Sequence, residues 1–168
     1  MAGDKYLYNN AGTITEKAAI QTSAGAGDAG KIPALDAAGK LDTSMMPTGI
    51  AADTASVTTS EALAAGDLVN IWNSTGAKAR KADATVAGKE AHGFVLSAVS
   101  SGAAATVYFE GTNSGVTGLT PGVQYLSTTA GLATATPPSG SGNVVQRVGF
   151  ATAAAALNFQ SQPPVVLA

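Results

Sequence analysis

Two residues in the middle of the chain have the types and spacing that proton transfer needs. Glu90 lies two positions before His92, so in a strand both side chains would point to the same face and could share a proton. His92 is the only histidine, which excludes a pair of catalytic histidines or a multi-histidine metal site. Serines are abundant, but no G-x-S-x-G motif occurs and no second candidate base is present, so a serine hydrolase is not expected. We interpret Glu90 and His92 as an ordinary surface or strand-edge pair and expect no enzyme and no catalytic residue.

Three glycines match a nucleotide-binding pattern. Gly25, Gly27 and Gly30 satisfy the G-x-G-x-x-G spacing with which a backbone approaches a pyrophosphate at the start of a helix. That mechanism needs a buried strand before the glycines and a long helix after them. Pro33 and Gly39 prevent such a helix. The match is therefore attributed to chance in a chain rich in glycine and alanine, and no cofactor or metal is expected.

Charge is scarce and unevenly distributed. The 168 residues are 12% charged, with a net charge of -2, whereas about a quarter of a typical soluble domain is charged. This balance argues against binding to nucleic acid through a basic face. After Glu110 the only charged side chain is Arg147. We expect Arg147 to form an ion pair with an acid from the charged half of the chain or from a neighbouring subunit.

One basic cluster remains, made of Lys78, Arg80, Lys81 and Lys89. It could contact an acidic partner, or it could be a solvated edge strand that its charges protect from aggregation. We favour the edge strand. The chain has no cysteine, no signal peptide and no apolar run near the roughly 18 residues that span a bilayer, so we expect a soluble protein made in the cytoplasm, with no membrane partner.

Residues 1–56 are expected to form an extended, mostly irregular arm. Residues 6–8 are a strand candidate that residues 13–15 could join as a hairpin, although residues 16–20 could equally form one helical turn. A near-repeat follows, in which residues 29–32 and 38–41 each have a turn, a lysine and an apolar residue. The arm has no room for its own core, so its apolar residues must be buried against another molecule. These predicted anchors are Ile32, Leu35, Leu41, Met45 and Met46.

Residues 57–168 predict an all-β domain, either a small β-barrel or a sandwich. Short runs rich in β-branched and aromatic residues alternate with turn signals every 8 to 12 residues or so. The predicted strands are 57–59, 67–72, 91–99, 104–109, 123–126, 132–134, 144–149 and 156–159. Residues 60–66 could form a short helix or a loop. Trp72, Tyr108 and Tyr125 are expected in the core.

Two stretches resemble structural proteins of tailed bacteriophages. Residues 30–47, GKIPALDAAGKLDTSMMP, are similar to a segment that in phage fibre and head-decoration proteins links an attachment region to a β-rich body. Residues 118–127, GLTPGVQYLS, with VVQRVGFA at 144–151 and LNF at 157–159, look like the terminal part of small phage β-domains.

This resemblance implies a capsid decoration (cement) protein. Such a protein binds the outer surface of the assembled head, with the major capsid protein as partner, as a homotrimer at three-fold positions and with the arm gripping the capsomers. The virion would be its final location. The alternative is a structural protein of a head or tail fibre, which would show repeated shaft segments or a receptor-binding tip with exposed aromatic residues.

Overall fold

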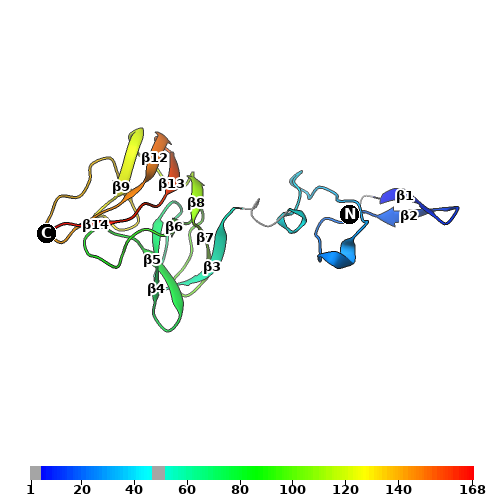
Figure 1. The fold of residues 1–168 in the computed structure, drawn as a ribbon, viewed down its shortest axis with the longest axis horizontal. Helices are drawn as coiled ribbons and strands as arrows, with labels where there is room; N and C mark the ends of the chain where they lie inside the picture. Colours follow the sequence, from blue (N-terminus) through cyan, green and yellow to red (C-terminus); the bar gives the residue numbers. More distant parts are fainter. Residues whose placement is uncertain (1–4, 47–51) are drawn as a thin grey trace. The chain divides into compact units, whose positions relative to one another are not determined.

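The structure is a computed structural model that describes residues 5–46 and 52–168 (Figure 1). It divides into two compact units, Met1–Ala51 and Ala52–Ala168. The second unit, here called the body, begins before the boundary expected at residues 56 and 57. Strand β3 (Thr54–Thr59) already pairs at Thr54 with Tyr108, so three residues assigned to the arm belong to the body's sheet.

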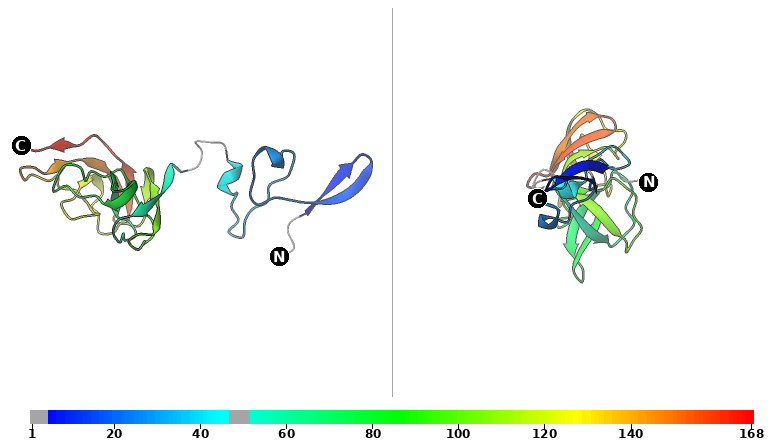
Figure 2. Two further views of the ribbon diagram at one scale, coloured as in Figure 1. Left: turned by 90° about the horizontal axis from the view of Figure 1, so that it is seen from below. Right: turned by 90° about the vertical axis from the view of Figure 1, so that its right-hand side faces the viewer.

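The N-terminal unit opens with a β-hairpin of β1 (Lys5–Asn10) and β2 (Thr13–Ala18). Its two-residue loop is Ala11 and Gly12, both with positive φ, 50° and 92°. Two such residues form the turn whose twist matches paired strands. The Gly12 amide also donates to Asn9 Oδ1 at 2.8 Å. The hairpin alternative is therefore confirmed, and the helical turn at residues 16–20 is wrong. No other strand among the described residues joins this pair (Figure 2).

The rest of the N-terminal unit is built from turns. It contains two 3-10 helices, η1 (Ala26–Asp28) and η2 (Thr43–Met45), and one parallel bridge between Ile20 and Pro33. The near-repeat is explained by Gly30 and Gly39, whose φ values of 76° and 74° turn the chain before each lysine. The expected mostly irregular arm is confirmed, with the hairpin as its regular part.

The body combines a closed barrel with a second sheet. The barrel strands follow the order β3, β5, β4, β6, β7, with β3 and β5 parallel. After β3 they are β4 (Leu68–Asn73), β5 (Ala77–Lys81), β6 (Gly93–Phe94) and β7 (Ala104–Tyr108). The barrel encloses one apolar cluster of Leu63, Val69, Ala79, Val95, Ala105 and Val107. The expectation of an all-β, barrel-containing fold is confirmed.

The second sheet has five strands in the order β10, β9, β12, β13, β8. These are β8 (Glu110–Asn113), β9 (Gly122–Leu126), β10 (Ala133–Thr134), β12 (Arg147–Ala153) and β13 (Ala156–Gln160), while β11 (Val144–Val145) pairs separately with β14 (Val165–Val166). One sheet face packs on the barrel. Phe159 from β13 meets Phe94 from β6 edge to face at 5.5 Å between ring centroids, within the body's larger apolar cluster.

Of the two alternatives for residues 60–66, the loop is confirmed and the short helix is wrong, because Leu63 bridges to Val99 and the Asp67 carboxylate accepts the Ala64 amide. Two local expectations need correction. Only Gly93 and Phe94 of the predicted strand at 91–99 are paired as a strand. The run at 144–149 is split between β11 and β12 at the buried Gln146.

The three aromatic residues expected in the core, Trp72, Tyr108 and Tyr125, are only partly buried. Tyr108 still stacks on Phe94, with 5.4 Å between ring centroids. Trp72 lies on the barrel surface instead, where its indole nitrogen donates to Ser60. The core is made mainly of smaller aliphatic side chains with Phe94 and Phe159.

Candidate functional site

The N-terminal unit exposes its apolar side chains. None of the described residues 5–46 is buried. Of the predicted anchors, Ile32, Leu35, Leu41 and Met46 are 49%, 52%, 47% and 39% exposed, and Met45 is half-buried. The unit therefore supplies no core for them, and their contact with a capsid stays a prediction.

The hairpin adds two exposed residues that the sequence reasoning missed. Leu7 and Ile14 are 76% and 63% exposed. Leu7 and Asn9 lie on one face of β1, and Ile14 is directly opposite Asn9, so Leu7 and Ile14 share that face. The sequence does contain one clue to this face, because alternate residues of a strand, such as Leu7 and Asn9, point to the same side. Placing Ile14 on that side also requires the register of β1 and β2. We call Leu7, Ile14, Ile32, Leu35 and Leu41 the apolar arm residues.

Aspartates shape the turns that present these residues. Asp28 accepts the Ala24 amide at 2.6 Å and binds Lys31 Nζ at 2.6 Å, directly before Ile32. The hydrogen bond from Lys31 is the main reason that the pKa of Asp28 lies below its usual value. Asp42 caps η2 by accepting the Ser44 amide, and Ser44 lowers the pKa of Asp42 in the same way.

Asp36 closes the second turn. Its carboxylate accepts the backbone amides of Ala38 and Lys40 at 2.8 and 2.9 Å, between the apolar residues Leu35 and Leu41. Local polar contacts thus fix the backbone of the N-terminal unit, while its apolar side chains stay uncovered.

The glycine pattern does not form a phosphate loop. Gly25 precedes η1, a 3-10 helix of only three residues, and no strand leads into it. The Ala24 amide, just before these glycines, already donates its hydrogen bond to the Asp28 carboxylate. This arrangement lacks the strand and helix on which dinucleotide binding depends.

Glu90 and His92 are held by different backbone groups. His92 Nδ1 accepts the Ile71 amide at 3.0 Å, and Glu90 Oε1 accepts the Gly88 amide at 2.9 Å. Both line a shallow hollow of about 360 Å³ together with Gln146. Their backbone hydrogen bonds give both side chains a structural role.

Three of the four residues of the basic cluster have partners within the body. Arg80 donates to Asn70 and to the Gly88 carbonyl, and its guanidinium lies 4.4 Å from the centre of the Trp72 ring. Lys81 binds Asp67 at 3.2 Å, and Lys89 binds Asp83 at 2.9 Å. The expected edge strand is wrong, because β5 lies between β3 and β4 in the closed barrel.

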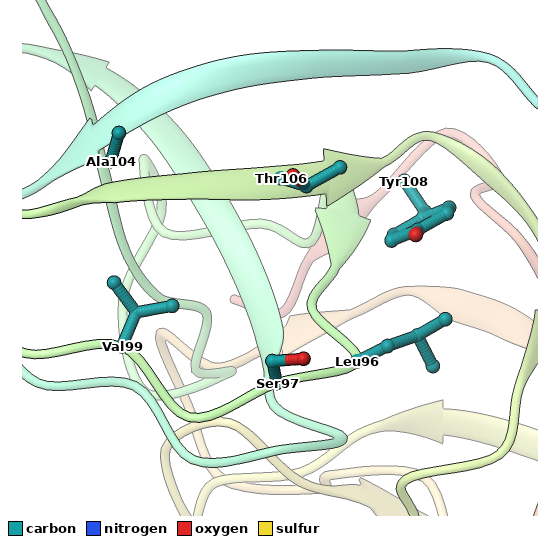
Figure 3. A pocket seen from close by; sticks show the side chains of 6 residues that line it. All are labelled: Leu96, Ser97, Val99, Ala104, Thr106 and Tyr108. Atoms are coloured by element: carbon teal, nitrogen blue, oxygen red, sulfur yellow. The ribbon is translucent and has the colours of Figure 1, made fainter. Parts of the chain in front are cut away.

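A small hollow opens beside β7. It measures about 190 Å³ and is lined along β7 by Ala104, Thr106 and Tyr108, and on the opposite side by Leu96, Ser97 and Val99 (Figure 3). Strands β6 and β7 pair only at Phe94 and Tyr108, so the chain after β6 separates from β7 and leaves this space. All lining side chains are uncharged, so the hollow offers van der Waals contact and hydroxyl groups.

Arg147 is exposed at the start of β12, and it forms no ion pair with any residue of 5–46 or 52–168. Its expected pairing with an acid of the charged half is therefore not found in this chain. Pairing with a neighbouring subunit stays a prediction.

Comparisons of the chain with protein-family models, curated proteins and solved structures found no match. Within the two described ranges, no helix has the length and apolar character to cross a membrane. The same residues contain no group of three or more histidine, cysteine or acidic side chains placed to hold a metal ion.

Proposed function

We propose that this chain is a virion structural protein that binds the outer surface of a phage capsid and stabilises it, as a homotrimer at three-fold positions. The observation that carries the proposal is the exposure of the apolar arm residues on a unit without buried residues. Exposed apolar side chains gathered on one segment are typical of a surface that is covered by a partner. The resemblance of residues 30–47 to phage virion proteins supports the major capsid protein as that partner.

The body suits attachment to a large repetitive surface. It has its own apolar clusters and needs no partner to bury them. Several separate contacts along one arm add avidity, and binding to an assembled head stabilises the head by mass action. A fibre protein remains the second candidate, because the segment at residues 30–47 resembles fibre proteins too.

Electron microscopy of phage heads with and without the chain tests this proposal. We expect globular densities at three-fold positions only when the chain is present. Thin projections would favour the fibre, and unchanged heads would contradict both candidates.

Substitutions in the arm sharpen the test. Ile32→Asp and Leu41→Asp should each weaken binding to heads, because a carboxylate at a buried contact loses its hydration. Val165→Asp is the matched control, since Val165 is 62% exposed but lies in the body. Equal binding by all three variants would contradict a role for the arm.

A further inference from the structure

The sheet face directed away from the barrel has a defined row of side chains. Val123, Phe150, Asn158 and Thr112 lie directly opposite one another on β9, β12, β13 and β8. Directly opposite residues of antiparallel strands point to the same side. Val123 and Phe150 are 41% and 38% exposed, so this side is the outward face.

The same face carries one acid and one base. Two residues further along β9, Tyr125 lies opposite Arg147 on β12, and two residues further along β13, Gln160 lies opposite Glu110 on β8. Positions two apart in a strand share a face, so Arg147 and Glu110 both belong to the outward face. Only β13 separates their strands, which places the two backbones about 10 Å apart.

These two charges differ from most charges of the body. Glu61, Asp67 and Asp83 each accept a hydrogen bond from a group of the same chain. Arg147 and Glu110 are exposed and form no ion pair with each other or with any other residue in the described part of the chain. An exposed base and an exposed acid on one face provide charge complementarity without a partner inside the molecule.

We propose that the outward face binds a second copy of this chain, with Arg147 of one copy paired with Glu110 of the next. A second copy necessarily offers the complementary charge, and the contact would cover Val123 and Phe150. Around a three-fold axis each copy gives its Arg147 to one neighbour and its Glu110 to the other, so the ring closes with every charge paired. The inference rests on the proposed function, because it names the surface through which the decoration subunits associate.

Sedimentation of the full chain without heads tests the contact. The variants are Arg147→Glu, Glu110→Arg and the double exchange, with Lys78→Glu as control. Lys78 also has no ion pair among the described residues, but it lies on barrel strand β5. We expect the wild type and Lys78→Glu to associate equally, and each single reversal to weaken association about 30-fold. The double exchange should restore it, because it places the opposite charge at both positions of every contact.

Other outcomes overturn the inference. These are a monomeric wild type, single reversals that associate like the wild type, or a double exchange that stays monomeric while circular dichroism shows native folding. Head binding is measured separately. A monomer that binds heads would reject this interface and leave binding to the capsid supported. Charge-dependent association without binding to heads would support the interface and contradict the proposed function.

Discussion

The N-terminal hairpin and the five-stranded sheet are both antiparallel, yet they differ in what covers them. In the sheet, one face packs on the barrel, and Leu157 and Phe159 are 0% and 1% exposed. In the hairpin, Leu7 and Ile14 are 76% and 63% exposed on strands with full register and a favourable turn. A two-stranded hairpin is only marginally stable in water. The difference shows that burial, rather than hydrogen-bonded pairing, distinguishes the two regions.

The largest expected effect comes from truncating the core. Phe159→Ala should lower the free energy of unfolding of the body by about 3–5 kcal/mol, because it removes a buried ring and leaves a cavity against Phe94. Leu7→Ala is the matched change in the hairpin and should leave that free energy within about 0.5 kcal/mol of the wild type. Urea unfolding monitored by Trp72 fluorescence measures both. Similar costs would remove the contrast between the two regions.

A backbone substitution in the sheet should come next. Gly149 has φ of 136° at the bulge between β12 and β9, and an added Cβ would lie 2.0 Å from the Asn158 carbonyl oxygen. Gly149→Ala should therefore cost about 3 kcal/mol. Gly142→Ala, with φ of 79° and open space around it, should cost about 1 kcal/mol. Thermal unfolding measures the stability lost in each variant. Equal losses would mean that the close approach of Gly149 to the Asn158 carbonyl does not contribute to the cost.

Replacing a buried amide should have a smaller effect. Gln146 is 2% exposed, accepts the Ala91 amide at 2.7 Å and donates to the Ala91 carbonyl at 3.0 Å. Gln146→Leu leaves the buried Ala91 amide without its partner, although Ser161 Oγ still donates to the Ala91 carbonyl, and should cost about 2 kcal/mol. Gln162→Leu changes an exposed side chain and should be nearly neutral. Chemical denaturation that ranks Gln162→Leu as the more harmful variant would contradict this role of Gln146.

The smallest expected effect is on the stability of the body at acidic pH, through Asp83. Burial raises the pKa of Asp83, but hydrogen bonds from Thr85 and Lys89 outweigh it and hold the pKa below the ordinary 3.8. The stabilisation is therefore present above pH 3.8 and is lost as the pH falls further through the lowered pKa. Asp83→Asn should flatten this part of the stability curve of the body. An unchanged acid slope in Asp83→Asn would assign the effect to other groups.

Much of the fold could be predicted from the sequence because turn residues and β-branched runs act locally. The hairpin at residues 6–15 and the strand at 104–109 follow from such signals. The division at Gln146 does not, since it depends on Ala91, which is 55 positions away. The position of β5 inside the barrel could not be predicted either, because it depends on pairing with β3 and β4 and on tertiary partners such as Asp67, which binds Lys81.

The candidate surfaces were predictable to different degrees. An arm without large apolar clusters cannot bury Ile32, Leu35 or Leu41, so their exposure follows from composition. The relation of Arg147 to Glu110 depends on the register of three strands, which no local pattern specifies. The isolation of Arg147 in the sequence still marked it as the charge to locate.

Hydrogen exchange of the full chain, free and bound to phage heads, tests the central claim most directly. We predict that buried strands of the body, such as β12 and β13, exchange slowly in both states. Residues 5–46 should exchange fast in the free protein and become protected on the head. Strong protection of residues 5–46 in the free chain, or fast exchange that persists on the head, would contradict the account.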